Sequence, residues 1–111
     1  MKSKFIAKKL NLISEELGPS PNDFAIQSHC EIACEGEPGG EAFIVHLISP
    51  TALARMLKLG AEPVIWGHDV FIMESVDEDK VLATIQQILY KVNADSWQEL
   101  IKLTSSMFKW V

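Results

Sequence analysis

Almost every second residue is apolar along residues 23–35, beginning at Phe24, and polar side chains fill most of the alternate positions. This period of two predicts a β-strand with one buried side and one side that faces solvent. Residues 36–40 read Gly-Glu-Pro-Gly-Gly, which is a strong loop signal. Residues 41–48 read as the returning strand, and both of its faces are fairly apolar, which suits an interior or partly covered strand. The two runs predict a β-hairpin closed by a five-residue loop.

Two further segments are expected to be strands. Residues 4–13 mix apolar residues with lysines without a clean period, and we predict a first strand there in preference to a helix. Residues 18–22, Gly-Pro-Ser-Pro-Asn, then break the chain. Residues 63–74 are rich in β-branched and aromatic residues, which predicts one strand, or two short strands around residues 67–69.

A short helix is predicted at residues 50–59. Ser49 is a favourable N-cap, and Pro50 suits the first helical position because its missing N–H would have no partner there. Gly60 follows as a stop signal, since glycine readily adopts the left-handed conformation that ends many helices.

Two more helices follow in the last third of the chain. Ser75 and Glu78 resemble a capping box, and apolar residues then recur at helical spacing as far as residue 92. Asp95, with Gln98 three residues on, is predicted to cap a final helix that runs towards Trp110. The buried stripe predicted for this helix is Trp97, Leu100, Ile101, Thr104 and Phe108.

The order of these elements predicts an α+β fold. We expect a mostly antiparallel sheet of four to five strands with three helices packed on one face. The 111 residues are expected to form a single domain, 1–111, because this length suits one hydrophobic core. Hydrophobic residues make up 48% of the chain, which is too many for a disordered protein.

The net charge of −5 bears on which class of partner the protein binds. An acidic surface argues against direct binding of nucleic acid and fits a basic protein partner, although acidity also serves solubility alone. No apolar run is long enough to span a bilayer, and the N-terminal lysines surround only a very short apolar patch. We therefore expect a cytoplasmic protein without a membrane partner.

Catalytic and metal chemistry find little support. On one strand, Cys30 and Cys34 would share a face about 13 Å apart, too far for a disulfide, so both are expected to be buried free thiols. A metal site with His29 is disfavoured, because neighbouring strand residues face opposite ways and no Cys-x-x-Cys spacing occurs. A nucleophilic pair of either cysteine with His46 is equally weak. We expect no catalytic residues, no cofactor and no metal.

Several motifs together resemble the immunity protein 8 family, small bacterial proteins that neutralise a toxin made by their own cell. In chain order they are a strand opening on Asp23-Phe24, the glycine-rich loop 36–40, Glu41-Ala42-Phe43, Ser49-Pro50 before a helix, the strand 70–73 followed by Glu74, the helix start Asp95-Ser96-Trp97, and the aromatic close 108–110. The resemblance covers the chain from about residue 23 onward. Relatives often continue past the last tryptophan with acidic residues, whereas only Val111 follows Trp110 here.

The resemblance implies a binding protein that neutralises a toxin domain of a polymorphic or contact-dependent inhibition system, and the acidity suggests that this toxin is a nuclease. Nucleases hold phosphates with basic side chains, so carboxylates that cover such a site can imitate the phosphate charge. Trp97 and Trp110 are expected in the core, whereas Trp66 lies beside a predicted turn and could anchor an interface. The candidate toxin-binding residues are Glu31, Glu35, Glu37, Glu41, Trp66, His68 and Asp69.

Two other interpretations remain open. A small acidic secretion-chaperone-like binding module would form an obligate dimer with an exposed apolar groove. A small enzyme would depend on Cys30 or Cys34 together with His46. For the immunity protein itself we expect a monomer or a weak homodimer, bound to the C-terminal domain of its toxin.

Overall fold

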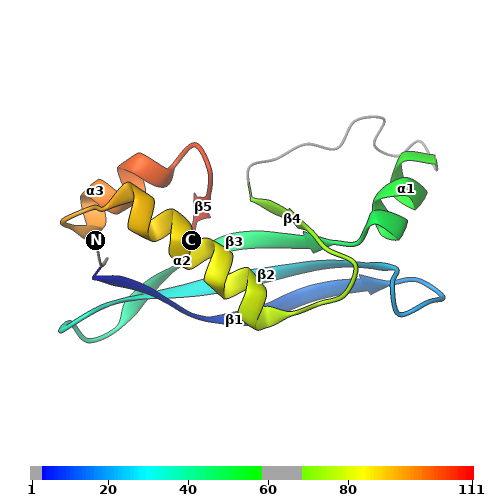
Figure 1. Ribbon diagram of the computed structural model, residues 1–111, viewed down its shortest axis with the longest axis horizontal. Helices are drawn as coiled ribbons and strands as arrows, with labels where there is room; N and C mark the ends of the chain where they lie inside the picture. Colours follow the sequence, from blue (N-terminus) through cyan, green and yellow to red (C-terminus); the bar gives the residue numbers. More distant parts are fainter. Residues whose placement is uncertain (1–3, 59–68) are drawn as a thin grey trace.

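The computed structural model describes residues 4–58 and 69–111. Its elements, in chain order, are β1 (Phe5–Leu17), β2 (Phe24–Cys34), β3 (Gly40–Ile48), α1 (Pro50–Lys58), β4 (Val70–Ile72), α2 (Glu78–Val92), α3 (Trp97–Thr104) and β5 (Lys109–Trp110). The strands form one sheet in the order β1-β2-β3-β4, and β5 pairs with β3 beside β4 (Figure 1). All pairings are antiparallel except β3 with β4, so the predicted α+β fold with a mostly antiparallel sheet is confirmed.

The β2–β3 hairpin forms the centre of the sheet. Cys30 pairs with Phe43 and Ser28 with Val45, and these side chains are fully or almost fully buried on the core face. The alternate positions, among them His29 and Glu31, are only half-buried because they lie on the other face of the sheet. The alternation along residues 23–35 therefore reflects burial of one face of β2, as predicted.

β1 is longer and less regular than predicted. It extends to Leu17 instead of ending at residue 13, and its pairing with β2 shifts register between Ala7 and Lys9 and again between Leu12 and Ser14. A β-bulge inserts an extra residue and so reverses which side chains face the core. The two shifts explain why this segment shows no clean alternation in the sequence.

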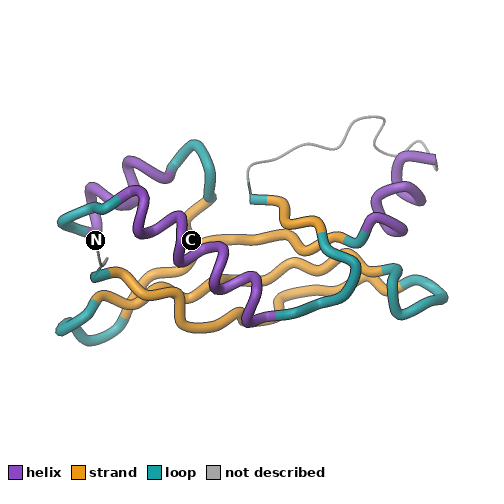
Figure 2. The backbone as a smooth tube through the Cα atoms, viewed as in Figure 1, coloured by secondary structure: helices purple, strands orange, loops and turns teal. Residues whose placement is uncertain are grey.

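Two helices cover the core face of the sheet. α2 runs diagonally across the strands, and α3 lies beside it (Figure 1). They bury Val81, Ile85, Leu89 and Leu100 against the apolar side of the sheet. α1 lies at the far end of β3 (Figure 2), where its Met56 lines a depression shared with Gln27 and His46 of the other face.

The capping residues predicted for α2 and α3 were wrong by one or two positions. α2 is capped by Asp77 rather than Ser75, because the Asp77 carboxylate accepts a hydrogen bond from the Lys80 N–H. α3 is capped by Ser96 rather than Asp95, and the Ser96 hydroxyl accepts from the N–H of Glu99. Each true cap lies nearer to the helix than the residue chosen from the sequence.

The predicted long last helix was also wrong. α3 ends at Thr104, and Lys109–Trp110 form β5, in which Trp110 pairs with Phe43. This return brings the aromatic residues together: the Phe43 and Phe108 rings stack with centroids 4.0 Å apart, and Trp110 meets Phe43 edge-on at 5.0 Å. Burial of large aromatic faces stabilises the strand more than continued helix would.

α1 is held to the sheet by a largely buried ion pair. Both side-chain oxygens of Asp23 accept hydrogen bonds from Arg55, at 3.0–3.2 Å, and only 3% of Asp23 is exposed. The Ser49 hydroxyl accepts from the N–H of Ala52, which confirms Ser49 as the N-cap. The predicted stop at Gly60 and the first half of the predicted strand 63–74 lie outside the described residues. In its second half, Val70–Ile72 form β4.

Candidate functional site

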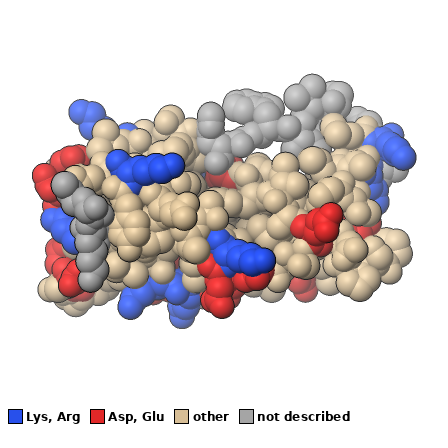
Figure 3. Space-filling model, viewed as in Figure 1, with Lys and Arg blue, Asp and Glu red and all other residues tan. Residues whose placement is uncertain are grey.

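The turn between β2 and β3 carries exposed acidic residues at one end of the molecule. Glu35 and Glu37 lie within the turn and Glu41 follows at the start of β3, and all three are exposed. Glu35 extends the β1–β2 ladder, because its N–H donates to the carbonyl of Lys4 at 2.7 Å. In Figure 3 acidic side chains gather at this end of the molecule, together with some basic ones.

The turn has a defined backbone. The Glu37 N–H donates to the carbonyl of Cys34 at 3.1 Å, and Gly36 and Gly39 adopt φ angles of +83° and +74°. Such angles suit glycine, because a side chain would clash with the backbone there. The carboxylates are therefore presented by a structured turn on a paired hairpin.

The four predicted glutamates do not form one surface. Glu31 lies along the strand on the half-exposed face, where Asn11 donates to its carboxylate at 3.2 Å and the Lys9 ammonium lies 3.9 Å away. Glu41 pairs in register with Ile32, a core-facing residue, and paired residues share a face of the sheet. Glu41 therefore projects to the same face as Ile32 and to the face opposite Glu31. Glu35, Glu37 and Glu41 therefore share the turn end of the hairpin, whereas Glu31 is already engaged by β1.

The second predicted cluster is only partly described. Trp66 and His68 lie outside the described residues. Asp69 contacts β3, with its carboxylate 3.3 Å from the Nδ1 of His46, and its carbonyl accepts from the His46 N–H at 2.9 Å. Asp69 therefore fixes the start of β4 against β3, and its carboxylate is already engaged by His46.

The cysteines are not arranged for nucleophilic chemistry. Burial, reinforced by the charges of Glu78 and Glu31, raises the pKa of the Cys30 thiol to about 12. The pKa of Cys34 is also raised, first by hydrogen bonding with Glu37. Both thiols are buried on the core face as free cysteines, as predicted, whereas His46 lies on the opposite face. The alternative Cys–His pair is therefore not formed.

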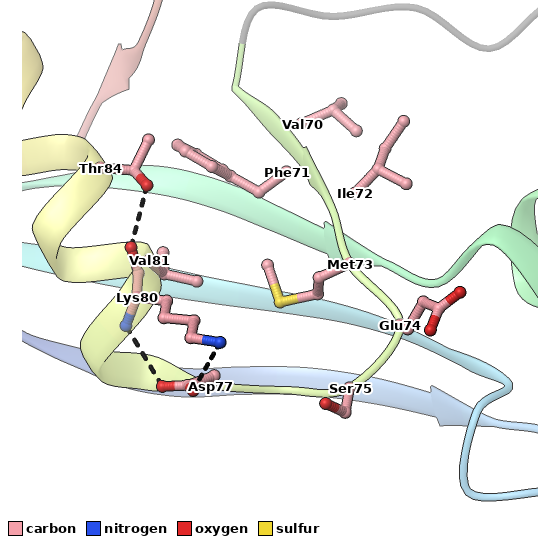
Figure 4. A pocket seen from close by; sticks show the side chains of 10 residues that line it. All are labelled: Val70, Phe71, Ile72, Met73, Glu74, Ser75, Asp77, Lys80, Val81 and Thr84. Carbon is pink, nitrogen blue, oxygen red and sulfur yellow. Dashed lines mark hydrogen bonds and ion pairs between the residues drawn. The ribbon is translucent and has the colours of Figure 1, made fainter.

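Sequence reasoning missed a depression of about 540 Å³ between β4 and the start of α2 (Figure 4). Phe71 of β4 and Met73, which directly follows β4, point towards α2, while Val70 and Ile72 point away from it. The charged groups at its rim, Lys80 and Asp77, pair with each other at 3.9 Å. No local sequence pattern predicts this depression, because its walls come from a strand and a helix whose packing against each other the pattern does not specify.

Comparison with known proteins shows which family this chain belongs to. The family model described as Immunity protein 8 matches residues 6–111. The chain belongs to the immunity protein 8 family. No curated protein and no solved structure matches it. As a member of this family, the immunity protein is directed against a toxin, which it binds as its protein partner.

The motif that first suggested the immunity protein 8 family proves to be structural. Ser96 caps α3, and the ring of Trp97 meets Phe5 edge-on with centroids 4.8 Å apart. Trp110 donates its indole N–H to the Thr104 hydroxyl at 2.9 Å. Trp97 and Trp110 are half-buried and pack against the hydrophobic core, so the motif has a structural role in the immunity protein. Within residues 4–58 and 69–111, no helix is long and apolar enough to cross a membrane.

Proposed function

We propose that the immunity protein blocks the active site of a nuclease toxin of the contact-dependent inhibition type by inserting the β2–β3 turn. The observation that supports this proposal is the group of three exposed carboxylates, Glu35, Glu37 and Glu41, at the tip of a paired hairpin. The inhibition is stoichiometric and needs no catalysis by the immunity protein. It takes place in the cytoplasm, where a reducing environment suits the free thiols of Cys30 and Cys34.

The charges explain why such a turn would enter a nuclease. A site that cleaves nucleic acid concentrates Lys, Arg or His to hold phosphates, and three carboxylates offer the same negative charge as the phosphates. The net charge of −5 adds long-range attraction to a basic partner. Electrostatic complementarity of this kind raises the association rate more than it slows dissociation.

The hairpin also reduces the entropic cost of binding. β2 and β3 pair along their length, and Ile32 and Phe43 near the turn are fully buried. A turn that is already ordered loses little conformational freedom when it docks. The carboxylates can therefore contribute to affinity without first paying for folding of the loop that carries them.

A charge-reversal experiment tests the role of the turn. We expect Glu37→Lys/Glu41→Lys to lower the association rate constant for the toxin domain by at least about tenfold at low salt, with a smaller difference at high salt. The matched control is Glu74→Lys/Asp79→Lys, which changes the net charge equally at exposed positions away from the turn. Rates are measured by surface-based kinetics at two salt concentrations.

If the two double variants slow association equally, net charge alone acts and the turn is not the contact. If neither variant affects binding, the inhibition does not depend on acidic groups and the nuclease-mimicry proposal is wrong. Circular dichroism spectra of both variants establish that they are folded.

A further inference from the structure

The free edge of β1 is covered over only its first half. Gln86 of α2 accepts from the Ala7 N–H and donates to the carbonyl of Phe5, both at 2.9 Å. Glu78, at the start of α2, accepts from the Leu10 N–H at 3.4 Å. Helix side chains therefore take the place of a neighbouring strand as far as Leu10, which removes the pairing hazard of an exposed edge.

The second half of the edge, Leu12 to Leu17, is open. Leu12, Ile13 and Leu17 are 60%, 45% and 63% exposed. Gly18 donates its N–H towards β2, to the carbonyl of Asp23. Because backbone groups alternate in direction along a strand, the groups of Leu17 and Glu15 point away from β2, to the open edge. Within residues 4–58 and 69–111, the structure shows no backbone hydrogen bond from these edge-facing groups to another element.

The charges on this half-edge show which strand could pair with it. Glu15 has no ion pair within the described residues, whereas Glu16 lies 3.7 Å from Arg55. A second copy pairing around a two-fold axis at Glu15 or Glu16 would place the glutamates of both copies in neighbouring positions. Like charges on facing strands are destabilising, so the edge disfavours its own copy and favours a basic strand.

We propose that the Leu12–Leu17 edge of β1 binds an extended segment of the toxin domain, in which Lys or Arg alternates with apolar residues. The segment adds a strand to the sheet: backbone hydrogen bonds supply affinity, and Glu15 with the exposed leucines selects the sequence. This inference rests on the proposed function, because it takes the toxin as the partner.

One toxin domain can reach both proposed contacts. The open edge and the acidic turn lie towards opposite ends of the sheet, about 35 Å apart along the eleven residue-to-residue steps from Lys4 to Glu15. A domain of 100–150 residues is about 35 Å across. The two contacts would hold the toxin along the 45 Å long axis of the immunity protein.

The test removes one edge-facing donor without changing the β1–β2 ladder. Proline lacks an N–H and is tolerated where that group faces out of the sheet, so Glu15→Pro is expected to weaken binding of the toxin domain about tenfold. Glu15→Lys alters only the side chain and is expected to weaken it by a similar factor. Leu12→Ala tests the exposed leucine of the edge in the same way. The control for the charge change is Glu74→Lys, and the control for Leu12→Ala is Leu103→Ala, which truncates an exposed leucine remote from the edge.

Calorimetric titration of the toxin domain separates the outcomes. If the wild-type protein does not bind, the proposed function fails. If it binds and the Glu15 and Leu12 variants bind equally well, the toxin is held elsewhere and the edge inference is wrong. If Glu15→Pro converts a dimer into a monomer by sedimentation but leaves toxin binding unchanged, the edge pairs with a second copy and the inference is likewise overturned.

Discussion

Gln86 offers a direct test of how the edge of β1 is protected. Its side-chain amide accepts from one backbone group of β1 and donates to another, as a neighbouring strand would. Gln86→Ala removes both hydrogen bonds and leaves the Ala7 N–H without its acceptor. We expect the variant to be less stable and to expose more of the β1 edge.

The magnitude follows from the two lost bonds. Each intramolecular hydrogen bond contributes about 0.5–1.5 kcal/mol, so the expected loss of unfolding free energy is about 1–3 kcal/mol. For a domain of this size that corresponds to a fall in Tm of about 5–15 °C. Gln86 is partly buried, which keeps water from replacing the amide fully.

Gln87→Ala is the matched control, because Gln87 is the next residue of the same helix and is exposed. The comparison cancels the gain in helix propensity that alanine brings to both variants. Urea denaturation gives the free energies, and hydrogen exchange at Ala7 reports the edge itself. Equal stability of the two variants, within about 0.5 kcal/mol, would refute the idea that Gln86 substitutes for a strand.

Three further predictions concern the core and the ends of the sheet. Thr104→Val removes the acceptor of the Trp110 indole N–H and should cost about 1–3 kcal/mol in urea denaturation; a cost below about 0.5 kcal/mol would contradict the pairing. Gly18→Ala places a methyl group against the buried Asp23 carboxylate and should lower the unfolding free energy by about 1–3 kcal/mol, whereas an unchanged value would show that the turn relaxes freely. Because the folded-state pKa of Cys30 is raised from 9.0 to about 12, the unfolded chain loses this proton first, and stability should fall as pH rises through that window. Cys30→Ala should show a shallower fall between these pH values, and an identical slope would argue against the raised pKa.

Alternation and glycine signals predicted the central hairpin because one face of it is buried and the other is not. The same logic failed at β1, where two bulges shift the side chains between faces. It failed again after Thr104, since a helical spacing of aromatic residues does not reveal that Phe108 and Trp110 can pack better on Phe43 as a returning strand.

The candidate site was predictable in part. Acidic residues beside a glycine-rich loop predicted an exposed acidic turn, and Glu35, Glu37 and Glu41 are found there. The engagement of Glu31 by Lys9 and Asn11 depends on the register between β1 and β2, which the sequence does not determine. The half-covered edge of β1 could not be predicted either, because it depends on where α2 crosses the sheet.

The central claim is that this protein neutralises its toxin by forming a complex with it. The most direct test is to express the toxin domain encoded beside it in cells, with and without the immunity protein, and to purify the complex. We expect restored growth and a one-to-one complex that weakens with salt. Cells that stop growing despite abundant folded immunity protein, with no complex recovered at low or high salt, would contradict it.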